Sequence, residues 1–311
     1  MSPPALTRPE RLDLRAMDRA WRRLATAPDA PWLHAEVGRR MSERLGIVRQ
    51  MPTQVLDWWG ELGASAPLLA RAYPAARIVR VSRPCAPSGL ADAETAPRVA
   101  PAWRRWLART GAPARPGPVE QAAVAAGQAG LVWCNMGLHW ATAVPALMRA
   151  WQQALAVDGF LMFSTLGPGT LQALGAMYAR QGWGTAYPPW IDMHDLGDML
   201  VEAGFADPVM DQETLALTWS TPQAALADLR ALGSNFDVAR HAGLRTPAWL
   251  ARVHETLRAG TDAQGRVQLD VEVVYGHAFK PQPRARLAPE TAVGLDDMRS
   301  MLHAGRPGRS R

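Results

Sequence analysis

The feature that most constrains the fold of this chain is the alternation of short apolar runs with amphipathic helical segments. The apolar runs have the length and the β-branched content of buried strands. They cover residues 53–57, 76–82, 130–136, 159–166, 207–219 and 267–280. Strands that alternate with helices predict an α/β fold with a mostly parallel, doubly wound sheet.

Segments with apolar residues at helical spacing lie between most of these runs. They cover residues 30–48, 66–73, 102–110, 143–155, 193–205, 222–233 and 247–260. The last two helices separate two late strands, which predicts an antiparallel addition at one sheet edge. We therefore expect an N-terminal segment at 1–29, one α/β domain at 30–280 with a helical insertion at about 221–260, and a flexible basic tail at 281–311.

The composition is that of a globular protein, with 48% hydrophobic and 20% charged residues among 311. No run of eighteen apolar residues and no signal peptide is recognisable, so we expect no membrane association. The two cysteines, Cys85 and Cys134, form no metal-ligand pattern. A reduced, cytoplasmic protein without a metal site is the prediction.

The formal net charge of +6 raises the question of nucleic acid. Lys280 is the only lysine, so nearly all basic residues are arginines, and they are spread along an alanine-rich chain. That distribution is typical of a GC-rich genome. It favours a mildly basic surface for an acidic protein partner over nucleic-acid binding.

In doubly wound sheets, ligands bind beyond the carboxyl ends of the strands. The turn VLDWWGELGAS (55–65), the end of the next strand at Ser82 and the stretch NMGLHW (135–140) are expected to share that rim. Strand, glycine-bearing turn and helix are the usual order at a nucleotide-cofactor loop. Two tryptophans stand where such a loop has small residues.

Three later stretches carry a family resemblance: LVWCNMGLHW, RAWQQALAVDGFLMFSTLGPGTL and IDMHDLGDMLVEAGFADPVMDQETLALTW. They resemble the class I S-adenosylmethionine-dependent methyltransferases, and most closely the malonyl-acyl-carrier-protein O-methyltransferases of biotin biosynthesis. With DLRALGSN and EVVYGHAFKP, the similarity runs from about Leu33 to Pro281. It implies a seven-stranded, Rossmann-like methyltransferase sheet, S-adenosylmethionine as cofactor and acyl carrier protein as partner. The same stretches also resemble the mitochondrial complex I assembly factor, which implies protein-arginine hydroxylation instead.

The resemblance implies a first turn of the form D-x-G-x-G-x-G, in which residues without Cβ let the backbone approach the cofactor. Asp57 and Gly63 match this pattern. Trp59 and Glu61 take the other two glycine positions, with Gly60 between them. A re-registered turn at Gly60 and Gly63 that binds the cofactor, and tryptophans that fill an emptied pocket, are both open interpretations.

The resemblance also implies an acidic residue at the end of the second strand, where this chain has Ser82. Loss of a charge-assisted hydrogen bond costs about 1.5–3 kcal/mol, so we expect cofactor binding weaker by roughly ten- to a hundredfold. Asn135 matches a polar residue beside the transferred methyl group. The expected cofactor-binding residues are Asp57, Gly60, Gly63, Ser82 and Asn135. Two classes of function follow, an enzyme with weak cofactor affinity and a non-catalytic relative with a binding or regulatory role.

On the substrate side, the resemblance implies His139 and Trp140 as a pocket wall and Tyr275 as a residue facing the site. A malonyl carboxylate is already a nucleophile at neutral pH, so methyl transfer needs alignment rather than a general base. Arg230 is the candidate to orient it. The insertion also carries Arg240, Arg245, Arg252 and Arg258, which could steer an acidic carrier protein.

Overall fold

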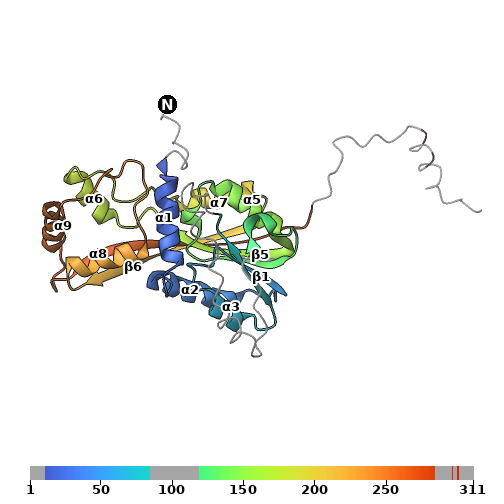
Figure 1. Cartoon of the computed structure of the whole chain (residues 1–311). Coiled ribbons are helices and arrows are strands. Elements are labelled where there is room, and N and C mark those ends of the chain that lie inside the picture. Colours follow the sequence, from blue (N-terminus) through green and yellow to red (C-terminus); the bar gives the residue numbers. More distant parts are fainter. Residues whose placement is uncertain (1–10, 85–118, 284–295, 297–299, 301–311) are drawn as a thin grey trace, which may run out of the picture. The chain divides into compact units, whose positions relative to one another are not determined.

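A computed structural model describes residues 11–84, 119–283, 296 and 300 of the chain (Figure 1). The chain divides into two compact units, Met1–Pro281 and Gln282–Arg311. In the second unit, the Ser300 hydroxyl donates to the backbone carbonyl of Asp296 (2.8 Å). The helix predicted at 102–110 lies outside the described residues.

The first unit holds a seven-stranded sheet in the order β3-β2-β1-β4-β5-β7-β6. Neighbouring strands are parallel except that β7 runs antiparallel to both β5 and β6. The α/β class and the antiparallel edge are thereby confirmed. The strands are β1 Gln54–Trp58, β2 Arg77–Ser82, β3 Val119–Glu120, β4 Ala129–Cys134, β5 Leu155–Leu166, β6 Ala206–Trp219 and β7 Val267–Phe279.

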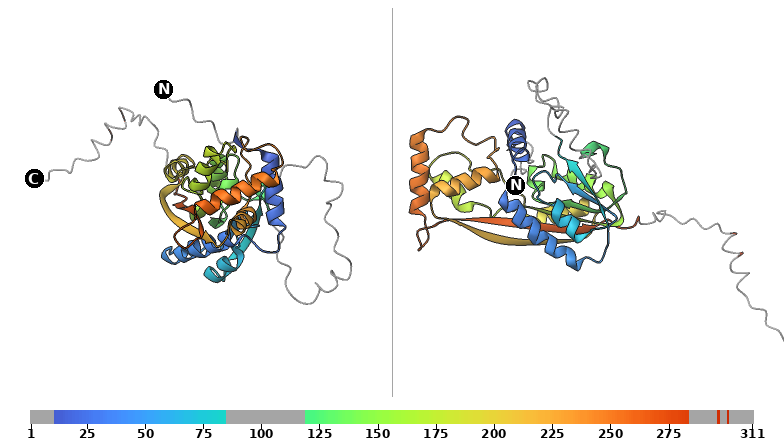
Figure 2. Two further views of the ribbon diagram at one scale, coloured as in Figure 1. Left: turned by 90° about the vertical axis from the view of Figure 1, so that its left-hand side faces the viewer. Right: turned by 60° about the horizontal axis from the view of Figure 1, so that its bottom comes forward.

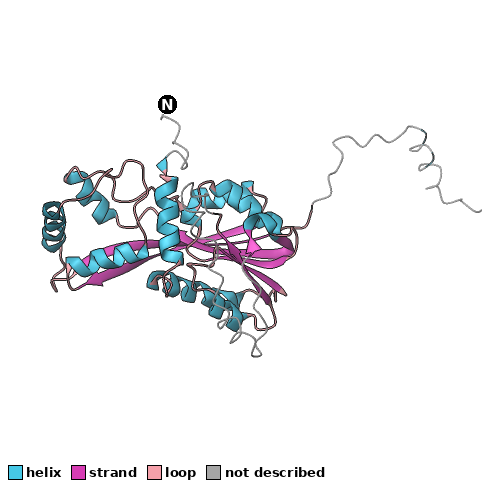
Figure 3. Ribbon diagram, viewed as in Figure 1, coloured by secondary structure: helices cyan, strands magenta, loops and turns pink. Residues whose placement is uncertain are grey.

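The helices cover both faces of the sheet, with α5 and α7 on one side and α2 and α3 on the other (Figure 3). Two further helices, α8 and α9, lie between β6 and β7, which confirms the helical insertion before the final strand. The helices are α1 Leu14–Ala25, α2 Trp32–Arg44, α3 Ala66–Ala72, α5 Val144–Ala154, α6 Gln172–Arg180, α7 Met193–Glu202, α8 Pro222–Leu232 and α9 Pro247–Ala259, with short 3₁₀ turns η2 Leu45–Ile47, η3 Gln121–Ala123 and η4 Leu138–Trp140.

The two inserted helices begin at matching sequence signals. Thr221 and Thr246 each accept a hydrogen bond from a backbone N–H of the first turn, and a proline follows each threonine. Threonine caps the free N–H groups, and proline at the first helical position has no N–H to satisfy. Local sequence therefore fixes where the insertion becomes helical.

Helix α1 lies inside the segment 1–29, where the sequence pattern predicted no helix or strand. The Asp13 carboxylate caps it by accepting a hydrogen bond from the backbone N–H of Ala16 (3.0 Å). Met17, Trp21 and Leu24 are buried on one side of the helix and join the core above the sheet. Part of the N-terminal segment therefore belongs to the packed body of the first unit.

The strands β6 and β7 extend beyond the rest of the sheet. Strand β5 pairs with β7 only as far as Val273, whereas β6 and β7 remain paired up to Trp219 and Val267. Figure 2 shows this long pair reaching the helices of the insertion. A separate hydrophobic cluster joins Met177 of α6, Ala225 of α8 and Val253 of α9 to the extended ends of the two strands, Trp219 of β6 and Val267 of β7.

Candidate functional site

The turn after β1 is filled by its own side chains. Trp58, Trp59 and Leu62 are each 5% exposed or less. Trp59 has a φ of 58°, a left-handed conformation that glycine adopts far more readily than tryptophan. Its indole N–H donates to Gln121 Oε1 (3.2 Å), and its ring meets Trp21 of α1 edge-on with centroids 6.2 Å apart.

Asp57 places a carboxylate in this turn with 1% of the residue exposed. Neither of its oxygens has a hydrogen-bond partner among the described residues, and neither has Glu61 Oε2. The nearest cation is the Arg80 guanidinium, with Nε 3.9 Å from Asp57 Oδ2. Burial raises the pKa of Asp57 to about 7, and the opposing effects of Arg80 and Ser65 are smaller. The turn therefore contains buried carboxylate oxygens without a matching donor.

Only glycine fits at position 60, because the Asp57 carboxylate occupies the space that a Cβ would take. A Cβ at position 60 would lie 2.0 Å from Asp57 Oδ2, inside the van der Waals limit. Gly63 is similarly confined, because a Cβ there would lie 2.7 Å from the Ser65 hydroxyl. Gly60 and Gly63 thus leave room for the side chains of Asp57 and Ser65, which a Cβ at these positions would meet.

Asn135, directly after β4, connects three elements rather than facing an open space. Its amide donates to the backbone carbonyls of His34 (2.7 Å) and Gly63 (2.6 Å), and its Oδ1 accepts from the Ser164 hydroxyl (2.8 Å). The His34 ring is held in turn, because its Nδ1–H donates to the carbonyl of Leu62 (3.0 Å). Burial lowers the pKa of His34 to about 4, so this ring is neutral. Contact between Asn135 and a cofactor stays a prediction.

At the end of β2, Ser82 is half-buried and pairs with Glu120 of β3. The next residue, Arg83, is 9% exposed and binds Asp18 of α1 (2.7 Å). Its guanidinium also lies over the rings of Trp21 (5.3 Å) and Trp59 (5.8 Å). An arginine therefore follows the position where the resembled family has its acidic residue. Sequence reasoning missed this arginine, although it stands directly after the predicted strand.

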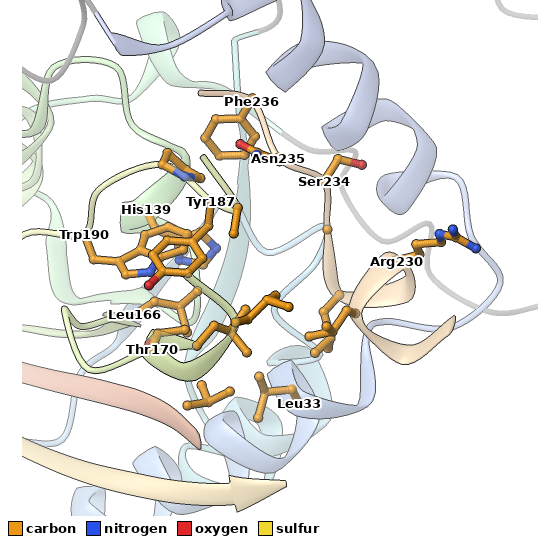
Figure 4. Close-up of a pocket in the computed structure, with 18 of the residues that line it drawn as sticks. Leu33, His139, Leu166, Thr170, Tyr187, Trp190, Arg230, Ser234, Asn235 and Phe236 are labelled. Atoms are coloured by element: carbon orange, nitrogen blue, oxygen red, sulfur yellow. The ribbon is translucent and has the colours of Figure 1, made fainter. Parts of the chain in front are cut away.

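A cavity of about 330 Å³ opens beside the carboxyl ends of β4 and β5 (Figure 4). Its wall is mainly aliphatic and aromatic, and His139 and Trp140 are part of it. Contact of these two residues with substrate stays a prediction. None of the residues 57–63, nor Ser82, lines it. The aromatic lining consists of Trp140, Tyr178, Tyr187, Trp190, Phe236 and Trp249.

The structure places the other two expected substrate residues at the border of the cavity and outside it, and their contact with substrate stays a prediction. Arg230 borders the cavity, but its guanidinium points away from the aromatic residues (Figure 4). Tyr275 lies four residues along β7 from the cavity-lining Val271, on the same face of the sheet, where its hydroxyl donates to Glu213 and the Arg44 guanidinium covers its ring at 3.9 Å. Burial raises the pKa of Tyr275, so it is a neutral donor to Glu213. Tyr275 is absent from the residues that line the cavity.

Most of the expected steering arginines are engaged within the protein. Arg240 pairs with Asp13 (2.6 Å), and Arg245 donates to the backbone carbonyl of Trp183 (2.5 Å). Arg252 binds Gln181 (3.0 Å). No helix in the described ranges has the length and hydropathy to cross a membrane. Among the same residues, no group of three His, Cys, Asp or Glu side chains could hold a metal ion.

Comparison with known proteins identifies close relatives. The chain is 38% identical over 286 residues to a malonyl-[acyl-carrier protein] O-methyltransferase of Laribacter hongkongensis, covering 90% of this chain and 92% of the relative. It is 36% identical to the enzyme of the same name from Gallionella capsiferriformans, covering 88% and 93%. No family model matches the chain. Haemonchus contortus phosphoethanolamine N-methyltransferase 2, solved with S-adenosyl-L-methionine, aligns with 14% identity and a TM-score of 0.42 over 78% of this chain and 53% of that one.

Proposed function

The chain belongs to the malonyl-[acyl-carrier protein] O-methyltransferase family, and we propose that it methylates the free carboxylate of a malonyl group held by an acyl carrier protein. The observation that carries the proposal is identity above one third along nearly the whole length of these relatives. Because the relatives named above are O-methyltransferases, O-methylation is favoured over protein-arginine hydroxylation. The methyl donor of such an enzyme is S-adenosylmethionine.

The charges of the β1 turn fit this cofactor, which carries a sulfonium and an ammonium group. Both carboxylate oxygens of Asp57 and Oε2 of Glu61 are buried and accept no hydrogen bond from the described residues, and the Arg80 guanidinium stays 3.9 Å from Asp57. Such oxygens are costly unless a cation or donor meets them. The shape of the turn fits less well, because the Trp59 indole and Trp21 of α1 pack there. We propose that Asp57 and Glu61 bind the sulfonium and ammonium groups, and that the Trp59 side chain moves aside when the cofactor binds. Bound there, the cofactor supplies an electrophilic methyl group.

The chain's own residues have a modest chemical task. The malonyl carboxylate is ionised at neutral pH, so no residue has to remove a proton from it. The aromatic walls of the cavity exclude water and confine the acyl group, which favours alignment. Arg230 is the only arginine or lysine among the residues that line the cavity. At the border, with its guanidinium turned outward, it serves to attract the carboxylate rather than to hold it deep inside.

Filling the cavity is expected to block turnover. In Leu226→Trp, an indole takes up part of the 330 Å³ cavity, and we expect kcat/KM for malonyl-carrier protein to fall at least about tenfold. The measurement is methyl ester formation, followed by mass spectrometry of the carrier protein. Ala231→Trp is the matched control, because Ala231 is exposed on the same helix and is not a lining residue. Equal turnover by Leu226→Trp and the wild type would exclude this cavity as the acyl site.

Replacing Ser82 with aspartate is expected to tighten S-adenosylmethionine binding by about tenfold, since a carboxylate gains a charge-assisted hydrogen bond where serine makes a neutral one. Calorimetric titration with S-adenosylmethionine and S-adenosylhomocysteine measures the change. Ser82→Asn is the uncharged control of the same size. If Asn tightens binding as much as Asp, the charge of the side chain is not what matters at this position.

A second function, a carrier-binding protein without catalysis, is favoured by one observation. The side chains of Trp21, Trp59 and Leu62 are all buried in or against the cofactor turn. The same titration decides between the two functions. Cofactor binding that is undetectable at millimolar concentration excludes the enzyme, whereas binding together with ester formation excludes the non-catalytic alternative.

A further inference from the structure

A second hollow, of about 340 Å³, lies beside the mouth of the cavity. One wall is α1, with Arg19 and Arg23, and the other is the segment after α8, with Ser234, Asn235 and Arg240. Ser234 and Asn235 also line the cavity, so the hollow and the cavity are contiguous. We call this hollow the arginine groove.

Two of its arginines are fixed by the protein itself. Arg23 donates to the backbone carbonyls of Arg230 and Gly233, both at 3.2 Å, and to the Ser234 hydroxyl at 2.9 Å. Arg240 donates to Asp13 Oδ2 (2.6 Å) and to the carbonyl of Asp237 (2.9 Å). These bonds tie α1 to the segment after α8, so the groove has a defined shape.

The third arginine is available to a ligand. Arg19 is exposed and makes no hydrogen bond or ion pair with the described residues. The lining of the groove contains no acidic residue. Beside it, the Asp13 carboxylate pairs with Arg240, accepts a hydrogen bond from the backbone N–H of Ala16 and attracts Arg19 without an ion pair. The groove therefore carries net positive charge beside an apolar cavity. This combination suits a ligand with an anionic group at one end and an uncharged arm at the other.

We infer that the arginine groove binds the phosphodiester of the prosthetic arm through which an acyl carrier protein holds its acyl group. The arm then passes Ser234 and Asn235, and its thioester enters the cavity. The inference rests on the proposed function for the identity of the arm. The phosphate recognition itself rests on Arg19, Arg23 and Arg240.

The test compares 4′-phosphopantetheine with pantetheine, which lacks the phosphate, as ligands of the full chain in calorimetric titration. We expect the phosphorylated compound to bind about tenfold more tightly, since an arginine–phosphate contact is charge-assisted. Arg19→Gln should remove most of that difference and leave the affinity for pantetheine unchanged. Arg149→Gln, a change of an exposed arginine on α5 outside the groove, should preserve the difference.

Equal affinities of the wild type for the two compounds overturn the inference, as does an Arg19→Gln variant that keeps the full difference. Binding of either compound only above ten millimolar overturns it as well. A preference of the groove for short RNA or anionic vesicles over 4′-phosphopantetheine overturns it in favour of another ligand. None of these readouts involves methyl transfer, so failure of the groove and failure of the proposed reaction are distinguishable.

Discussion

Replacing Trp59 with glycine is expected to tighten S-adenosylmethionine binding by at least about tenfold and to lower the free energy of unfolding by about 2–4 kcal/mol. The indole is 5% exposed and packs against Trp21, so its removal both empties space in the turn and leaves a cavity. Glycine also suits the φ of 58° at this position. Calorimetric titration measures the affinity, and urea unfolding measures the stability.

Two further variants distinguish the effect of removing the Trp59 indole from the effect of relieving backbone strain at position 59. Trp59→Ala empties nearly the same space but keeps a Cβ at a left-handed backbone position, so it should be less stable than Trp59→Gly by about 1 kcal/mol. Trp219→Phe, at a buried tryptophan of β6 in the outer hydrophobic cluster, lowers stability away from the turn and should leave cofactor affinity unchanged. An unchanged affinity in Trp59→Gly would mean that the indole does not obstruct the cofactor.

Replacing Asp57 with asparagine is expected to stabilise the protein above neutral pH while abolishing cofactor binding. Burial raises the pKa of Asp57 from an ordinary value of 3.8 to about 7. Between these values the folded protein binds more protons than the unfolded chain, so stability falls as pH rises through this window. A shift of about three pKa units means that ionised Asp57 lowers the free energy of unfolding by about 4 kcal/mol at pH 8. An unsatisfied asparagine amide costs about 1–3 kcal/mol, which leaves a net gain of about 1–3 kcal/mol.

The measurement is urea unfolding of wild type and variant from pH 4 to pH 8. The gain should be largest at pH 8 and should turn into a loss of about 1–3 kcal/mol near pH 4, where the folded wild-type carboxyl is protonated and only the cost of the asparagine amide remains. Asp198→Asn, a change of an exposed carboxylate on α7, should leave the curve unchanged. Parallel stability curves for wild type and Asp57→Asn would show that Asp57 is not a strained buried acid. Undiminished cofactor affinity would remove it from the proposed site.

The strands β1, β2 and β4 were predictable because buried parallel strands are short and apolar, and β7 because its residues alternate along a long antiparallel strand. Strand β3 was not, because Val119–Glu120 is too short to show any periodicity. Helix α1 has a signal that could have been read, since Met17, Trp21 and Leu24 recur at helical spacing among many arginines. Its location against the cofactor turn depends on tertiary contacts, which periodicity does not report.

Part of the candidate site was predictable from the positions of the strand ends. His139 and Trp140 border the cavity because they follow a strand end, and topology alone places them there. The face of Tyr275 follows from strand alternation: Val274 joins the core above the sheet, whereas Tyr275 joins the core below it together with Val271. Because Val271 lines the cavity, Tyr275 is separated from the cavity along the strand and not across the sheet. The contacts of Arg83 with Asp18, and of Arg23 with Gly233, join distant segments and have no local sequence signature.

The extension of β6 and β7 beyond β5 has an evolutionary consequence. The helices α6, α8 and α9, which supply part of the cavity wall, rest on a two-stranded ribbon with its own hydrophobic cluster, attached at one edge of the sheet. Mutations that reshape this outer body leave the hydrogen bonding of the central parallel strands intact. A lineage can therefore exchange the group that the cavity accepts, or lose and regain specificity, by remodelling one peripheral module while the inherited sheet stays the same.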